Sequence, residues 1–295
     1  MTKDPPATKK IKTIQAAQQP GDDLWKKEWV PSHGEATIAQ RSRENPECHF
    51  RLYNSFFCPF GQRSWIVAEE VGVDYQWIEI NPYHVDETRE GGYTKKALPL
   101  EEKARLYPDF VKVSPRGLVP GLQHENVMLW ESLPVAEYID AQFGSGQLAG
   151  TTPYEKARIQ VWTAHITERV VRQFAKALMA QDMKVREQAN KEFFKESRTL
   201  AKAMSDEGPY FLGTRFSLVD VALAPFWQRA ISVGNHYMNL ELPQDPEFER
   251  LRQWWNACKE RASVKRTFVC EARLISTYLD YSLGTATSDS SKNYK

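Results

Sequence analysis

The chain has 295 residues, of which 41 % are hydrophobic and 26 % are charged, and its formal net charge is +1. This length predicts two domains, and the composition is that of a soluble globular protein. A near-neutral charge argues against a nucleic-acid partner, and no apolar run is long enough to cross a membrane.

Residues 1–45 are rich in Lys, Gln, Ala, Pro and Asp and show no sustained periodicity. They predict a largely irregular extension, whose Trp25 and Trp29 either anchor it to the folded body or stay partly exposed. The segment matches neither a signal peptide nor a mitochondrial presequence, because it lacks an apolar core and has no arginine before Arg41. The sequence therefore predicts a cytoplasmic protein.

Residues 46–143 have the pattern of an α/β domain. A short apolar strand ends near Phe57, a helix runs from Pro59 to the glycine stop at Gly72, and a second strand covers residues 75–80. Two strands joined by one helix form a βαβ unit, so these strands are expected to pair in parallel.

The rest of this domain completes a thioredoxin-like order of elements. Residues 84–110 are expected to form an insertion, a loop with a short helix near residues 100–106. Two short apolar runs flank residues 124–126 and predict an antiparallel hairpin. Ser132 is then expected to cap the helix that follows.

Residues 151–282 predict an all-helical domain, because apolar positions recur at helical spacing almost throughout. One long helix is expected to carry the apolar stripe from Trp162 to Leu178. A last helix is expected over residues 264–281, and the polar residues 283–295 predict a disordered tail.

Ser217 and Asp220 have the spacing of a capping box at the start of one of these helices. We interpret the box as structural, so its loss should destabilise the fold rather than remove a catalytic group.

Cys58 lies between the first strand and its helix, which places its sulfur at a helix N-terminus. Unpaired N–H groups and the helix dipole favour the nucleophilic thiolate there. A buried, inert cysteine is the alternative. No second cysteine follows within three residues, so Cys58 would need an external thiol to resolve a disulfide. The four cysteines show neither a Cys-x-x-Cys pair nor a zinc-finger spacing, which predicts that no metal is bound.

Four segments resemble those of omega-class glutathione transferases and occur in that family's order. They are Cys58–Arg63, Ser114–Leu122, Leu129–Asp140 and Tyr210–Asp220. The resemblance covers residues 48–282. It implies the glutathione transferase fold, in which an α/β thioredoxin-like N-terminal domain precedes an all-α C-terminal helical domain.

The resemblance also implies a site with Cys58 as the catalytic residue. The residues it implies for glutathione binding are Phe60, Val119, Pro120, Glu131 and Ser132. A cis peptide bond before Pro120 would let the Val119 main chain pair with the cysteinyl backbone of glutathione. Glu131 would bind the γ-glutamyl ammonium, and Ser132 the adjoining carboxylate.

Phe226 and Arg229 are implied to line an acceptor-substrate cleft between the domains, with Tyr154 and Trp162 as further candidates. From periodicity alone, aromatic residues at such positions belong to the core. The family's usual lysine after the second strand is absent here, which leaves Lys95 and Lys96 as its candidate replacements.

A cysteine in this position implies glutathione-dependent thiol transfer. Cys58 would form a mixed disulfide with glutathione during deglutathionylation or dehydroascorbate reduction, with no cofactor beyond glutathione. Two alternatives stay open: a conjugating transferase that forms C–S bonds, and a non-catalytic protein that binds glutathione or other ligands. The resemblance further implies a homodimer and a small electrophilic or disulfide co-substrate.

Overall fold

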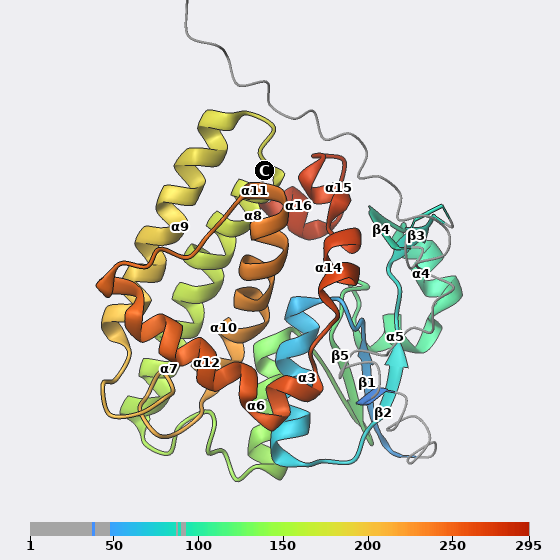
Figure 1. The fold of residues 1–295 in the computed structure, drawn as a ribbon. Coiled ribbons are helices and arrows are strands. Elements are labelled where there is room, and N and C mark those ends of the chain that lie inside the picture. Colours follow the sequence, from blue (N-terminus) through green and yellow to red (C-terminus); the bar gives the residue numbers. More distant parts are fainter. Residues whose placement is uncertain (1–36, 39–47, 87, 90–92, 295) are drawn as a thin grey trace, which may run out of the picture. The chain divides into compact units, whose positions relative to one another are not determined.

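The computed structural model describes residues 37–38, 48–86, 88–89 and 93–294 (Figure 1). The predicted extension, residues 1–45, lies almost entirely outside this set. None of the helices among the described residues has an apolar stretch of membrane-spanning length.

A four-stranded sheet forms the centre of the α/β part. Its strands, in spatial order, are β2 (Gln76–Glu79), β1 (Phe50–Asn54), β5 (Gly121–His124) and β6 (Val127–Trp130). β1 pairs in parallel with β2 and antiparallel with β5, and β5 and β6 form the predicted hairpin. The thioredoxin-like fold class predicted for this part is confirmed.

The two faces of this sheet are covered by different helices. Leu52 belongs to the core that includes α3 (Pro59–Val71) and α6 (Ser132–Phe143), whereas Tyr53 packs with Phe110 of α5 (Pro108–Val113). Successive residues of a strand point to opposite faces, which is why neighbours in β1 enter separate cores.

Residues 84–110 contain more regular structure than predicted. The short helix is present as α4 (Leu100–Leu106), but a two-stranded hairpin of β3 (Tyr83–Val85) and β4 (Tyr93–Ala97) precedes it. Neither strand has a clean alternation of apolar and polar residues, so the local sequence does not predict a strand there. Val85, an apolar residue of β3, is exposed.

The second half is helical, as predicted. Its first elements are α7 (Pro153–His165), the π-helical segment Ile166–Val171, α8 (Arg172–Met179), α9 (Met183–Ala203) and α10 (Leu218–Arg229). A second π-helical segment (Ala230–Gly234), α11 (Asn235–Met238), a 3₁₀ turn (Pro246–Phe248) and α12 (Glu249–Glu260) follow. The single long helix predicted around the stripe from Trp162 to Leu178 is thus interrupted by π-helix. The capping box is confirmed, because the Asp220 carboxylate accepts hydrogen bonds from the Ser217 N–H and hydroxyl.

The end of the chain corrects two predictions. In place of one helix over residues 264–281 there are three short ones, α13 (Ala262–Arg266), α14 (Glu271–Thr277) and α15 (Leu279–Ser282). The predicted disordered tail is folded up to its penultimate residue and ends in α16 (Asp289–Tyr294). Figure 1 shows α14, α15 and α16 beside α8 and β4. Polar residues are ordered here because they are buried and hydrogen-bonded: the Ser291 hydroxyl, for example, donates to the Ala286 carbonyl.

Candidate active site

Cys58 is the N-cap residue of α3, in the position predicted for it. Its backbone is extended (φ −83°, ψ 119°), and its Sγ accepts a hydrogen bond from the Gly61 N–H at 3.5 Å. The side chain is half-buried, which leaves the sulfur accessible to a ligand. By contrast, Cys258 is fully buried in the core, and burial raises the pKa of its thiol well above the usual value.

An apolar cavity opens beside the Cys58 sulfur. One wall is formed by the cysteine turn and its neighbours, Phe57, Cys58, Pro59, Phe60, Pro82 and Val119. A second wall belongs to the helical part and contains Val171, Phe174, Ala175, Leu178, Met179 and Phe226. The remainder comes from the β3–β4 hairpin and the C-terminal segment, with Tyr83, Lys95, Tyr278, Tyr281 and Ser290. The cavity therefore lies where three parts of the chain meet.

Of the four residues expected at an acceptor cleft, Phe226 alone is part of this cavity. Arg229 is fully buried behind it, and its guanidinium donates to the Phe57 carbonyl (3.0 Å), Gln62 Oε1 (2.7 Å) and the Tyr278 hydroxyl (3.1 Å). A side chain so fully engaged holds the cysteine turn in place and does not meet a ligand.

Tyr154 and Trp162, the further candidates for the acceptor-substrate cleft, do not line this cavity. Tyr154 is the second residue of α7 and is 74 % exposed, so it faces solvent. Trp162 packs against Phe211, with ring centroids 5.2 Å apart, and therefore belongs to the helical core.

Lys95 reaches the cavity from β4. Its side chain is 3 % exposed, and Nζ lies 4.0 Å from the ring centroid of Phe57 and 4.6 Å from that of Tyr83. Tyr278 and Tyr281 complete this aromatic surround at 5.4 and 5.9 Å. Burial lowers the pKa of Lys95 to about 7, against the opposing influence of Cys58. Lys96, the other candidate for the missing lysine, is exposed.

The residues expected at the γ-glutamyl end lie together at the junction of β6 and α6. Glu131 has a left-handed backbone (φ 71°) and an exposed carboxylate 3.7 Å from Arg116. Ser132 is the first residue of α6 and not its cap, because Glu131 occupies the N-cap position. The Ser132 hydroxyl instead accepts a hydrogen bond from the guanidinium of the buried Arg63 at 3.4 Å.

The peptide bond between Val119 and Pro120 is cis, as expected. Val119 lines the cavity, whereas Glu131 and Ser132 do not. Of the predicted glutathione-binding residues, Phe60 and Val119 therefore share the cavity wall with Cys58, whereas Pro120, Glu131 and Ser132 lie outside it.

Comparisons with known proteins show the family to which the chain belongs. The model of the glutathione S-transferase N-terminal domain matches residues 57–142, and that of the C-terminal domain matches residues 183–257. Protein IN2-1 of Zea mays is 30 % identical over 219 residues, which cover 73 % of this chain and 79 % of that protein. The chain belongs to the glutathione S-transferase family.

Several of its relatives within the family are of the omega type. Glutathione S-transferase omega-1 of Rattus norvegicus is 27 % identical over 80 % of this chain and 86 % of its own length. The crystal structure of glutathione transferase Omega 3C from Trametes versicolor superposes with a TM-score of 0.67, at 29 % identity, over 84 % of this chain and 97 % of that one. Glutathione S-transferase L2 of Arabidopsis thaliana is 32 % identical, and the match spans 57 % of its length. The resemblance stated from the sequence is confirmed.

Several residues that shape this transferase's site were not singled out from the sequence. Arg63 lies within the recognised cysteine segment, yet its role depends on distant partners: it donates to the Ala222 carbonyl and the Thr167 hydroxyl, both at 3.1 Å. Its guanidinium also lies over the rings of Phe60 and Phe226, at 5.3 and 4.8 Å from their centroids, and burial lowers the pKa of Arg63 to about 10. Tyr278 and Tyr281, which line the cavity, were not predicted either. Their three-residue spacing is the one sequence signal for them, because residues three apart share a helical face.

Proposed function

We propose that this protein catalyses glutathione-dependent thiol transfer through a mixed disulfide between Cys58 and glutathione. The observation that carries the proposal is the position of the Cys58 sulfur, at a helix N-terminus and on the wall of a cavity. Backbone N–H groups at a helix N-terminus attract an anion, and the thiolate is the form of cysteine that attacks disulfides.

The reaction would proceed in two exchange steps. The Cys58 thiolate attacks the glutathionyl sulfur of a mixed disulfide, a Cys58–glutathione disulfide forms, and the partner sulfur leaves with the electron pair of the broken bond. A second glutathione, as its thiolate, then attacks the glutathionyl sulfur on Cys58. Oxidised glutathione leaves and the Cys58 thiolate is restored. The partner thiol is thus released at the expense of one reduced glutathione, because the other half of the oxidised glutathione comes from the substrate.

The residues proposed to hold glutathione are Phe60, Val119, Pro120, Glu131 and Ser132. Val119 would offer its main chain beside Cys58, and the N-terminus of α6 at Ser132 would receive the γ-glutamyl carboxylate. The buried Arg63 behind Ser132 places a positive charge at the same end. A homodimer and a cytoplasmic location stay predictions.

Conjugation of glutathione to an apolar electrophile is the second candidate. It is favoured by the aliphatic and aromatic wall of the cavity, which would accommodate a hydrophobic acceptor. In that reaction a C–S bond forms on glutathione itself, and no adduct on Cys58 is needed.

Intact-mass spectrometry after incubation with oxidised glutathione separates the two candidates. We expect one glutathione adduct on the wild type, reversed by excess reduced glutathione and absent from Cys58→Ser. Cys270→Ser is the matched control, because Cys270 is also half-buried but lies outside the cavity; this variant should still form the adduct. A wild type that binds glutathione without forming an adduct would favour conjugation or plain binding.

A further inference from the structure

Lys95 is a buried basic residue on the cavity wall, and it has no role in the thiol-transfer steps described above. Its Nζ points among aromatic rings on the cavity wall, and no hydrogen-bond acceptor contacts it among the described residues. Ring faces attract an ammonium, but they do not replace the hydrogen bonds that its three N–H groups would make in water. An ammonium left in this state is poised to give a proton or a hydrogen bond to whatever enters the cavity.

The leaving group of thiol transfer is an anion released into this same cavity. Its walls are mostly aliphatic and aromatic, so they cannot solvate a thiolate. The tyrosines around Lys95 are poor proton donors to this anion, because burial raises the pKa of Tyr83 and of Tyr278 above the usual value. Lys95 is thus the proton source at hand where the charge develops.

We propose that Lys95 transfers the proton in both halves of the reaction, as acid to the departing thiol and then as base toward the incoming glutathione. This inference rests on the thiol-transfer function proposed above. In the first half, the leaving sulfur takes the electron pair of the S–S bond and a proton from the Lys95 ammonium, and departs as a neutral thiol. In the second half, the Lys95 amine takes the proton of the glutathione thiol, whose thiolate attacks the Cys58 disulfide. The ammonium and the Cys58 thiolate are both regenerated.

The charges around Lys95 suit this alternation. The titratable groups that face it come from every element packed against it, namely Cys58, Tyr83, Arg229, Tyr278, Asp280 and Tyr281. Burial, and to a smaller extent Arg229, favours the neutral amine, whereas Cys58 and Asp280 favour the ammonium. A pKa of about 7 leaves both forms accessible near neutral pH, which is where acid–base catalysis is most effective.

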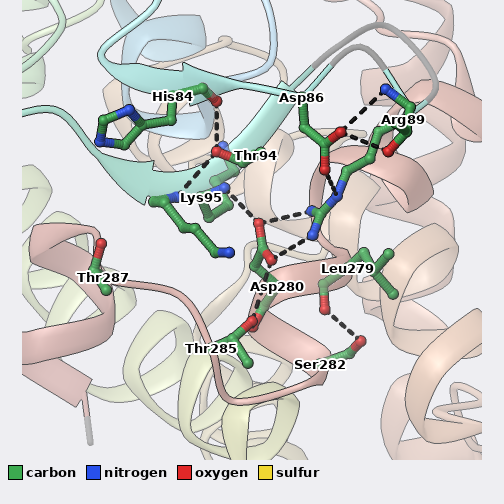
Figure 2. A network of polar contacts seen from close by, with 12 residues as sticks. His84, Asp86, Arg89, Thr94, Lys95, Leu279, Asp280, Ser282, Thr285 and Thr287 are labelled. Atoms are coloured by element: carbon green, nitrogen blue, oxygen red, sulfur yellow. Dashed lines mark hydrogen bonds and ion pairs between the residues drawn. The ribbon is translucent and has the colours of Figure 1, made fainter.

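The backbone of Lys95 is held by the C-terminal segment. Figure 2 shows Asp280 between Arg89 and the Lys95 main chain: its carboxylate accepts the Lys95 N–H at 2.7 Å and two Arg89 N–H groups at 2.8 and 2.9 Å. The Thr287 N–H donates to the Lys95 carbonyl at 3.0 Å. Because the N–H and the carbonyl of Lys95 are both hydrogen-bonded, its side chain keeps the same position on the cavity wall through both proton transfers.

The test compares Lys95→Met with Lys96→Met in single-turnover glutathionylation of Cys58. Two mixed disulfides of glutathione serve as probes, one with 2-mercaptoethanol and one with 4-nitrothiophenol, whose thiolate is stable without a proton. For the mercaptoethanol probe, we expect Lys95→Met to lower the rate about 100-fold, the lower end for general acid catalysis. With the nitrothiophenol probe the same variant should react at close to the wild-type rate, and Lys96→Met should match the wild type with both.

The pH profile adds a readout that a purely structural role would not move. The ratio of the wild-type to the Lys95→Met rate, with the mercaptoethanol probe, should fall as pH rises through 7, because the ammonium that donates the proton is lost. Equal slowing with both probes, or no slowing with either, would overturn the role of Lys95. A wild type that forms no Cys58 adduct with either probe would instead overturn the thiol-transfer function itself.

Discussion

At the scale of single residues, the cysteine turn is fixed by side chains on both sides of it. Asn54, at the end of β1, donates to the Gly61 carbonyl at 2.9 Å and accepts from the Ser55 N–H at 2.8 Å. Arg229 binds the Phe57 carbonyl from the helical part. The backbone on each side of Cys58 is therefore held by a buried polar group, and the sulfur is held with it.

Gly61→Ala tests how closely this turn is packed. A Cβ on Gly61 would lie 1.8 Å from Asn54 Oδ1, so Asn54 or the start of α3 has to move. We expect a loss of about 1–3 kcal/mol in the free energy of unfolding, as for overpacking of a core, together with slower adduct formation at Cys58. Chemical denaturation and intact-mass kinetics measure the two effects.

The double variant Asn54→Ala/Gly61→Ala serves as the control, because it removes the obstructing amide. It should be more stable than the sum of the two single changes predicts. Additive losses, or a Gly61→Ala protein as stable as the wild type, would show that the close approach does not constrain the turn.

The residues predicted from the sequence and those found only in the structure differ in the range of their contacts. Cys58 was predictable because a strand, a cysteine and a helix start follow one another along the chain. Arg229 was assigned to the cleft from sequence, but its neighbours Phe57 and Gln62 are more than 160 positions away. Lys95 likewise owes its surround to Tyr278 and Tyr281, which no local pattern connects to it.

At the scale of elements, the β3–β4 hairpin and the C-terminal segment stabilise each other. Asp280 joins them through Arg89 and the Lys95 N–H, and the Thr287 hydroxyl accepts the Ala97 N–H at 2.9 Å. Burial raises the pKa of Asp280, but the hydrogen bonds from Arg89 and Lys95 outweigh it and hold the pKa below the usual value. At neutral pH the ion pair of Asp280 with Arg89 therefore stabilises the contact between the β3–β4 hairpin and the C-terminal segment.

Asp280→Asn should loosen this join. The change removes the charge that pairs with Arg89, and we expect faster hydrogen–deuterium exchange in residues 93–97 and 285–294, with a loss of about 2 kcal/mol in local stability. Because the folded pKa lies below the unfolded one, the wild-type contribution is complete above about pH 4 and disappears as pH falls through the folded value. Asp280→Asn should lack this acid-dependent step.

Asp109→Asn is the matched control, since the ion pair of Asp109 with Lys112 is exposed on both sides and contributes little. Exchange in residues 93–97 and 285–294 should be unchanged in this variant. Equal protection in the Asp280→Asn and wild-type proteins would contradict the stabilising role given to Asp280.

The same interdependence explains which elements the sequence could predict. Strands β1 and β2 and helix α3 carry their own apolar periodicity, so they were predicted near their observed bounds. The β3–β4 hairpin packs against α14 and α15, and α16 packs against α8, so both depend on contacts between distant positions. Composition alone made residues 283–295 resemble a disordered tail, because the partners of their polar groups lie outside any local window.

At the scale of the whole described region, the α/β part and the helical part share one hydrophobic core. Trp65 and Val67 of α3 belong to the same buried cluster as Trp227 of α10 and Trp254 of α12. Polar contacts join the parts as well, since Gln62 donates to Thr267 and the guanidinium of Arg266 binds the carboxylate of the buried Glu69. Parts joined in this way are expected to unfold together.

The contact of Glu70 with Arg261 tests this coupling between the two parts. Arg261 binds the Glu70 carboxylate through Nε and Nη2, and Ser263 donates to the same carboxylate. Both side chains are mostly buried, so a double-mutant cycle of Glu70→Gln and Arg261→Met should give a coupling energy of about 1–2 kcal/mol. Each single variant should shift far-UV circular dichroism and tryptophan fluorescence to the same lower midpoint. Two results would contradict coupled unfolding of the α/β and helical parts. One is a separation of the two signals into distinct transitions, and the other is a coupling energy below about 0.5 kcal/mol.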